Sequence, residues 1–167
     1  GRAGHPGPAA AAQPLMAPRP ARPGEAEAIR ALVRGAYAAW VPAVGREPAP
    51  MTDDYAARIA AGQAWVAERD GTLAGFMIGC GSQCEHDSSN FRWFRERHER
   101  FFYIDRIVVA SRRRGGGLGR AFYADAQSYA ELRYPNIACE VFLDAAIDAA
   151  VPDPALLFHG SFGFREV

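Results

Sequence analysis

The segment Arg112-Arg113-Arg114-Gly115-Gly116-Gly117-Leu118-Gly119 combines the residue types that bind an anion. Glycines let backbone N–H groups approach a ligand closely, because no Cβ atom stands in the way. The N-terminus of a following helix adds unpaired amides and partial positive charge, and the arginines add full charges. This combination predicts a phosphate or pyrophosphate site. A solvated basic loop without a ligand is the alternative interpretation.

The sequence narrows the kind of phosphate site. Its 19 lysine and arginine residues are all arginine. Without lysine the chain cannot form a Walker-type phosphate loop, a Schiff base or a kinase-type lysine site. The dinucleotide pattern G-x-G-x-x-G also fails, because Arg120 stands where the third glycine would be. What remains is Arg-x-x-Gly-x-Gly between a strand and an amphipathic helix.

Asp105 is the first candidate for moving a proton. It is a carboxylate in the otherwise apolar stretch from Phe101 to Val109, and burial would make it a stronger base. Strand alternation predicts that Tyr103, Asp105 and Ile107 share one face. A salt bridge to a neighbouring arginine, or a contact to a substrate amine, is an equally good role for this carboxylate.

The elements that must position these groups follow from apolar spacing and turn residues. The first half predicts a strand from Leu15 to Arg19, a helix opened by Pro23, a loop from Pro42 to Pro50, a capped helix ending at Ala60, and a hairpin of Gln63–Arg69 and Leu73–Gly79. The second half predicts a short helix within Phe91–Arg100, a strand at Phe101–Val109, a helix from Leu118 to Leu132, a strand at Ile137–Leu143 and a last helix from Pro154 to Gly163. This order predicts an α/β (α+β) domain with a mixed central sheet, flanking helices and no second domain.

Two stretches of the chain resemble the GNAT superfamily of acyl-CoA N-acyltransferases. The strand Ile104–Val109, followed by Gly117–Phe122, resembles the acetyl-CoA motif of that superfamily. Pro154–His159, followed by Phe162-Gly163-Phe164, resembles its late helix ending in a Gly-Phe pair. The resemblance covers about residues 15–167. Asn90–Phe94 together with the start of the acetyl-CoA motif is further similar to a bacterial branch of predicted acetyltransferases.

The resemblance implies acetyl-CoA, or another acyl-CoA, as the donor of an acyl group to an amine of a small molecule. It also implies a splay between the fourth and fifth strands. A bulge before the splay would aim backbone amides at the pantetheine and thioester, where they could polarise the carbonyl. The donor contacts are therefore expected at Ile107, Val108, Val109, Arg112, Arg113, Arg114, Gly115, Gly116, Gly117, Leu118, Gly119 and Arg120.

Direct transfer needs a deprotonated nucleophile and a protonated leaving thiolate. Many members of the superfamily carry a tyrosine acid in the late helix, and here that position aligns with His159, a departure from the pattern. Tyr103 and Tyr123 are the other candidate acids, and Glu140 is the reserve base. The superfamily usually closes with a hairpin after the Gly-Phe pair, whereas this chain ends at Val167. An unpaired strand edge would favour a homodimer.

The segment Ser82–Arg100 lies where the superfamily often builds contacts to the acceptor. A polar or cationic acceptor is indicated by Glu85, His86, Asp87 and Trp93, and Tyr103 on the following strand is a further expected substrate contact. Two alternatives remain: an acyl group delivered on an acyl carrier protein, and a non-catalytic CoA-binding module. Nucleic acid is not an expected partner, because acidic residues dilute the arginines and aromatics of this segment.

The net charge and the cysteine content limit which partners and which cellular compartment are expected for this protein. The formal net charge is zero, which gives no field toward nucleic acid or a membrane. Three cysteines, an odd and sparse set, predict a reducing compartment rather than a disulfide framework, so we expect a cytoplasmic protein. A zinc site of Cys80, Cys84, His86 and His98 would lack the paired C-x-x-C spacing, and no metal is expected. Residues 1–14 have no apolar h-region and are interpreted as a disordered leader or an expression remnant.

Overall fold

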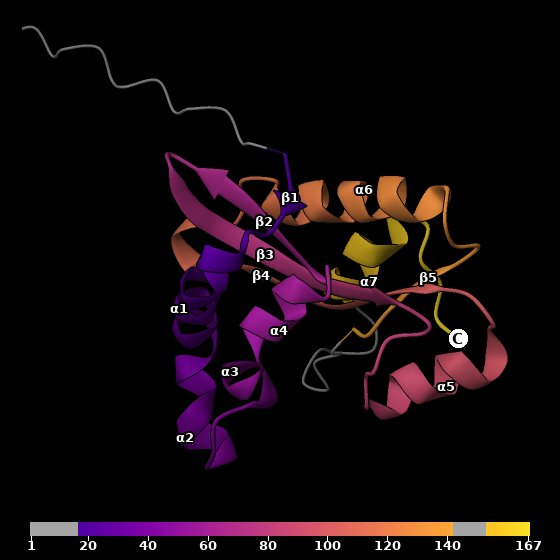
Figure 1. Ribbon diagram of the computed structural model, residues 1–167, viewed down its shortest axis with the longest axis horizontal. Coiled ribbons are helices and arrows are strands. Elements are labelled where there is room, and N and C mark those ends of the chain that lie inside the picture. The colour runs from indigo at the N-terminus through magenta and orange to yellow at the C-terminus, as the bar shows by residue number, and fades with distance from the viewer. Residues whose placement is uncertain (1–16, 142–152) are drawn as a thin grey trace, which may run out of the picture.

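The computed structural model describes residues 17–141 and 153–167 (Figure 1). The predicted leader, residues 1–14, lies outside these ranges. So do the start of the predicted first strand and the connection Asp144–Val151.

A five-stranded mixed sheet runs through the domain in the order β1-β2-β3-β4-β5. The strands are β1 (Arg19–Pro20), β2 (Ala64–Arg69), β3 (Thr72–Gly81), β4 (Phe102–Val109) and β5 (Ile137–Cys139). The first four pair antiparallel, and β5 pairs parallel with β4. This arrangement confirms the predicted mixed sheet. Its parallel pair needs a crossover connection, which α6 (Leu118–Glu131) provides.

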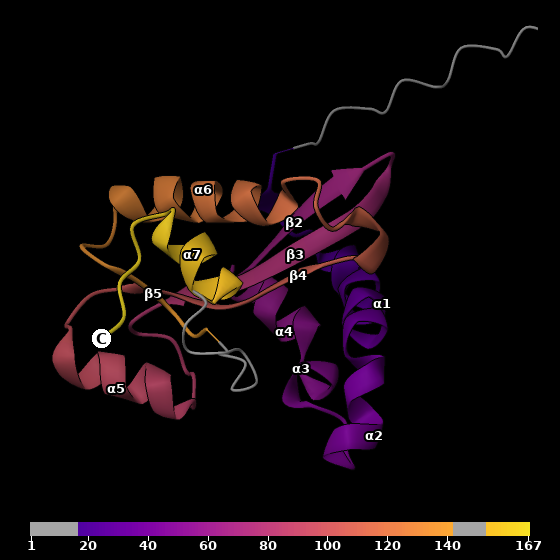
Figure 2. The ribbon, with the colours of Figure 1, turned by 180° about the vertical axis from the view of Figure 1, so that it is seen from behind.

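Helices cover both faces of the sheet (Figures 1 and 2). The long helix α6 and the late helix α7 (Pro154–Gly160) lie on one face. The other face carries α1 (Ala26–Tyr37), α2 (Val41–Val44), α3 (Ala49–Thr52) and α4 (Tyr55–Ala60), while α5 (Ser89–Arg97) lies near the end where β5 joins the sheet. The predicted loop from Pro42 to Pro50 is wrong in part. Each of these prolines stands in the first turn of a short helix, where its fixed φ favours helix and its missing N–H is not needed.

Each face of the sheet has its own core. Under α6 the buried side chains include Trp65, Phe102, Ile104 and Phe122. Under α1 and α4 they include Ile29, Tyr55, Phe76 and Val108, and a smaller aromatic cluster of Phe91, Phe101 and Tyr103 seats α5. The helix α5 turns its phenylalanines inward, since Phe91 is fully buried and Phe94 packs against the same cluster. Ser88 caps this helix by accepting a hydrogen bond from the Phe91 amide at 2.9 Å.

A bulge at Asp105 changes which residues of β4 share a face. Gly79 pairs with Ile104 and the adjacent Ile78 pairs with Arg106, so Asp105 is the extra residue on β4. The predicted alternation of Tyr103, Asp105 and Ile107 on one face is therefore wrong. Tyr103 packs in the α5 cluster, whereas Ile107 packs against the core under α6. The bulge itself is what the family resemblance implied.

Candidate functional site

The fourth and fifth strands part beside the bulge. They pair only at Phe102 with Ile137, Tyr103 with Ala138 and Ile104 with Cys139. Beyond Ile104, β4 continues to Val109 with no β5 partner among the described residues. The predicted splay between these strands is confirmed.

Backbone alternation decides which amides of β4 face the splay. The Ala110 N–H donates to the Ala74 carbonyl on β3 at 2.9 Å. Because hydrogen-bonding direction alternates along a strand, the N–H groups of Val109 and Ile107 point away from β3, toward the splay. Val108 directs its N–H to β3 instead. Of the three predicted contacts on this strand, two thus present an amide to the opening.

The glycine turn follows directly after β4. A 3₁₀ turn at Ser111–Arg113 leads into Gly115 and Gly117, with φ angles of 75° and 80°, and α6 begins at Leu118. Residues other than glycine rarely adopt these left-handed backbone conformations. The backbone N–H groups of the glycine turn therefore lie next to those at the start of α6, which is the geometry of an anion-binding site.

The arginines of the turn have different surroundings. Arg113 pairs with Asp70 at 2.8 Å, while Arg112 and Arg114 are exposed. Arg120 lies over the rings of Phe158 and Phe162, 5.5 and 5.6 Å from their centroids, and so faces α7.

A fifth arginine at the turn was missed by sequence reasoning. Arg69, at the end of β2, lies against Gly116. Only the docking of the β2–β3 hairpin on the glycine turn brings it there.

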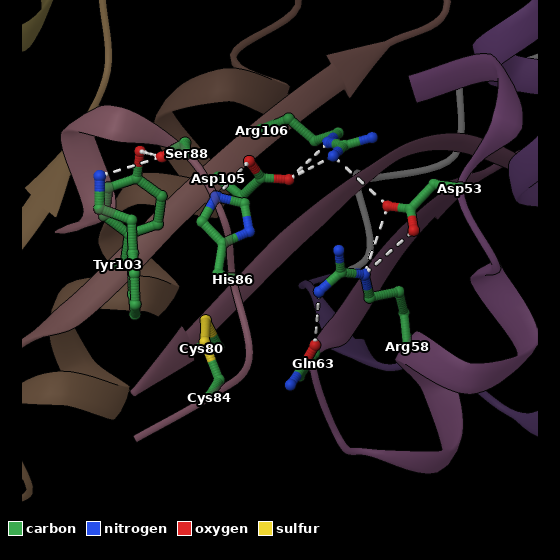
Figure 3. The surroundings of a disulfide bond; sticks show 11 residues. Asp53, Arg58, Gln63, Cys80, Cys84, His86, Ser88, Tyr103, Asp105 and Arg106 are labelled. Atoms are coloured by element: carbon green, nitrogen blue, oxygen red, sulfur yellow. Dashed lines mark hydrogen bonds and ion pairs between the residues drawn. A yellow bond between two sulfur atoms is a disulfide. The ribbon is translucent and has the colours of Figure 1, made fainter. Parts of the chain in front are cut away.

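Asp105 lies in a chain of alternating charges (Figure 3). Its Oδ2 accepts a hydrogen bond from Arg106 Nε at 2.6 Å, and Arg106 Nη2 lies 3.3 Å from Asp53 Oδ2. Asp53 in turn pairs with Arg58 at 3.2 Å. Burial opposes the charge of Arg106, but Asp105, Tyr55 and Asp53 together raise its pKa above the ordinary value. The salt bridge considered for Asp105 is thus present.

His86 lies at the Asp105 end of this row of charged side chains, on the side of α5. Its Nε2 lies 3.4 Å from Asp105 Oδ1, within ion-pair distance, although the geometry is not that of a hydrogen bond and this buried nitrogen has no hydrogen-bond partner among the described residues. The ring packs against Phe91 and Tyr103, with centroids 5.1 and 5.3 Å apart. His86 is therefore placed to respond to the charge of Asp105.

Glu140 lies just past the end of β5, beside the splay. Its Oε1 accepts hydrogen bonds from the Tyr103 hydroxyl and, at 2.9 Å, from Ser88 Oγ. Burial of the phenol, together with the hydrogen bond to Glu140, raises the pKa of Tyr103 far above its ordinary value. Tyr103 is thus a firm hydrogen-bond donor that holds the exposed Glu140 carboxylate at the opening.

His159 and Tyr123 form a pair on the opposite face of the sheet. The His159 Nδ1 lies 2.6 Å from the Ala155 carbonyl, which can only accept, so Nδ1 carries a proton. Nε2 then accepts the hydrogen bond from the Tyr123 hydroxyl at 2.7 Å. Burial, with Cys139 nearby, raises the pKa of Tyr123. Asp105 and His159 are therefore not brought together, because they lie on different faces of the sheet.

A cavity of about 880 Å³ joins several predicted site residues. It flanks β5 between α5 and α7, and Trp93, Glu140 and His159 are among its lining residues. Of the five residues predicted to contact substrate, only Trp93 lines this cavity. Glu85 is exposed, and Asp87 pairs with Arg92 on the surface. His86 and Tyr103 pack against each other in the aromatic cluster that seats α5.

The cysteines depart from expectation. Cys80 and Cys84 form a disulfide, so the prediction of reduced cysteines is wrong for this pair. The chain turns back after β3, with the Cys84 amide donating to the Gly81 carbonyl at 3.0 Å, and this brings the two Cα atoms to 6.1 Å. Cys139 is a free thiol. Within the described residues, no cluster of three or more His, Cys, Asp or Glu side chains could hold a metal ion, so the zinc alternative does not assemble there.

Comparison with known protein families identifies the family of this chain. The model of the Acetyltransferase (GNAT) family matches residues 27–164, which is most of the chain. The chain belongs to this family. Membership makes it an acyltransferase with an acyl-CoA donor, and it agrees with the splayed strands and the glycine turn. Among curated protein sequences, none matches this chain.

Solved structures confirm the GNAT fold. A mutant of the BH1408 protein from Bacillus halodurans is 19% identical with a TM-score of 0.64, over 90% of this chain and 94% of that one. A GNAT acetyltransferase from Listeria monocytogenes is 18% identical with a TM-score of 0.63, over 90% and 86% of the two chains. The aminoglycoside acetyltransferase AAC(6')-Iy, solved with a bisubstrate analogue of CoA, is 18% identical with a TM-score of 0.62, over 92% of each chain. None of the helices in residues 17–141 and 153–167 is long and apolar enough to cross a membrane.

Proposed function

We propose that this GNAT protein transfers an acetyl or other short acyl group from acyl-CoA to the amine of a small molecule, by direct attack of the amine on the thioester. One observation carries the proposal: β4 and β5 part after Ile104 and Cys139, and the free end of β4 leads directly into the glycine turn. A donor held by its phosphates at the turn can pass its pantetheine into this opening. There the N–H groups of Ile107 and Val109 can stabilise the oxyanion of the tetrahedral intermediate.

The acceptor is a cationic small molecule that meets Glu140. This carboxylate is exposed at the splay, lines the cavity with Trp93, and is held by Tyr103 and Ser88. A fixed carboxylate beside an aromatic surface favours an ammonium group. The fold similarity to AAC(6')-Iy, an aminoglycoside N-acetyltransferase, is compatible with a cationic acceptor.

Two proton transfers accompany the reaction. The attacking amine, in its neutral form, bonds to the thioester carbon and loses a proton to Asp105, directly or through a water molecule, while the hydrogen bond from Arg106 holds this carboxylate in place. Collapse of the intermediate breaks the C–S bond. The Tyr123 hydroxyl gives its proton to the thiolate sulfur, because the Nδ1 proton of His159 is already donated to the Ala155 carbonyl, and the phenolate then regains a proton from solvent.

A mass-spectrometric screen of small amines tests this function. The purified protein is incubated with acetyl-CoA, a longer acyl-CoA or an acetylated carrier protein, and products are detected by their added acyl mass. We expect N-acylated cationic amines with acyl-CoA. Turnover only with the carrier protein would replace the donor, and absence of any product across donors and amine classes would contradict the proposal.

A further inference from the structure

Arg69 lies against the glycine turn, although it belongs to a different part of the chain. The turn of the β2–β3 hairpin has left-handed residues at Asp70 and Gly71, with φ angles of 54° and 71°. This turn docks on the glycine segment through the ion pair between Asp70 and Arg113, 2.8 Å long. A Cβ atom placed on Gly116 would lie only 2.8 Å from Arg69 Nη1 and 3.6 Å from Arg69 Cζ. The guanidinium thus occupies the space beside the Gly116 backbone.

The charge of Arg69 is not neutralised by the part of the chain that the structure describes. Its Nε is buried and has no hydrogen-bond partner there, and none of the ion pairs found there includes Arg69. Arg113 already has Asp70, and Arg112 and Arg114 are exposed to solvent, which satisfies them. Of the arginines at the turn, Arg69 alone combines partial burial with the lack of an anionic partner among residues 17–141 and 153–167. A partly buried cation without a partner is costly, and a bound anion would remove that cost.

We propose that Arg69 binds a phosphate at the nucleotide end of the donor and so selects CoA over phosphopantetheine on a carrier protein. The proposal rests on the donor role of the glycine turn. The turn amides and the start of α6 hold one phosphate group, and Arg69 binds a second beside Gly116. CoA carries a pyrophosphate and a 3′-phosphate, whereas carrier-bound phosphopantetheine has a single phosphate. A nucleotide donor therefore supplies a partner for Arg69 that carrier-bound phosphopantetheine does not.

Calorimetric titration of three ligands into wild type and Arg69→Gln tests the proposal. The ligands are CoA, 3′-dephospho-CoA and 4′-phosphopantetheine. We expect Arg69→Gln to weaken CoA binding roughly 10- to 100-fold, the usual scale for one charge-assisted contact, and to leave phosphopantetheine binding unchanged. Loss of affinity for CoA and dephospho-CoA together assigns Arg69 to the pyrophosphate, and loss for CoA alone assigns it to the 3′-phosphate.

Two further variants keep the test decisive. Arg34→Gln removes an exposed arginine of α1 and should bind all three ligands as wild type does. Gly116→Ala leaves the charge of Arg69 but displaces its guanidinium, so it should weaken the same ligands as Arg69→Gln, even if that variant folds poorly. Equal loss for all three ligands, or no loss, overturns the role of Arg69 while leaving the acyl-CoA function in place. Wild-type protein that binds none of the three would overturn both.

Discussion

At the scale of single residues, the two carboxylates near the splay have unlike surroundings. Asp105 is enclosed by Arg106 and His86, whereas Glu140 is exposed and held by two hydroxyl groups. An enclosed carboxylate suits proton transfer at a fixed place, and an exposed one suits binding of a cation from solution. The two residues should therefore differ in which kinetic constant they control.

We expect Asp105→Asn to lower kcat by roughly 10²–10⁴-fold, the usual effect of losing a general base, and to leave CoA affinity unchanged. Glu140→Gln should instead raise the KM of the amine, with a smaller effect on kcat. Steady-state kinetics over a range of pH measure both effects, and only Asp105→Asn should remove the acidic limb of the profile. Wild-type turnover in Asp105→Asn would show that Asp105 has a structural role, and Glu140 would then be the candidate base.

Tyr123 and His159 should act as one unit. The Tyr123 hydroxyl is the hydrogen-bond donor to His159 Nε2, so a change in either residue interrupts the same proton path. Tyr123→Phe and His159→Phe should each slow turnover less than Asp105→Asn does, because solvent can protonate a thiolate with a pKa near 8–9. A double-mutant cycle measures the coupling, and the double variant should be no slower than the worse single one. Additive losses would show that the two act separately.

At the scale of elements, the glycine turn depends on left-handed backbone at its junction with α6. Gly117 has a φ of 80°, and valine there would both strain the backbone and cover the neighbouring amides. CoA at 100 times its Kd should stabilise wild type by about 2.7 kcal/mol, seen as a rise in Tm. In Gly117→Val this rise should disappear.

Gly45→Val is the matched control for this change. Gly45 has a similar φ of 73° at the end of α2, with open space around it, so valine there adds comparable strain away from the turn. Its Tm should fall, but the increment caused by CoA should persist. A full CoA increment in Gly117→Val would contradict the role of the turn.

At the scale of the whole molecule, two buried side chains whose pKa values are raised by folding make the stability of the protein depend on pH in the alkaline range. Burial raises the pKa of Cys139 from 9.0 to about 11, and burial raises that of Tyr55 from 10.0 to about 12. The folded protein therefore keeps protons that the unfolded chain releases. The contribution of these two groups to the free energy of unfolding is complete below pH 9 and is lost as the pH rises through their pKa values in the folded protein.

The unfolding free energy should fall between pH 9 and 11, by about 1.4 kcal/mol for each unit of pKa difference. Denaturant midpoints measured across this range give the slope. Cys139→Ala should lower stability at neutral pH through lost packing but flatten the alkaline decline. Equal slopes in wild type and Cys139→Ala would mean that the Cys139 thiol ionises alike in both states.

The sequence alone determined the features that depend on local chemistry. Hairpin residues Asp70-Gly71, the capping Asp54 and the glycine turn fix their own backbone geometry, so the elements around them were predicted nearly to their ends. The order of these elements then predicted the mixed sheet, and the residues of two motifs, at the glycine turn and in the late helix, carried the family resemblance.

Only the tertiary structure decided which distant groups meet. Strand alternation could not foresee the bulge at Asp105, because a bulge is a property of pairing with β3 and not of β4 alone. The disulfide of Cys80 with Cys84 depends on how the chain turns after β3. Arg69 reaches the glycine turn because the β2–β3 hairpin docks there, and His159 faces Tyr123 because α7 packs on α6. Local residue types set the elements, whereas contacts between segments far apart in sequence set the site.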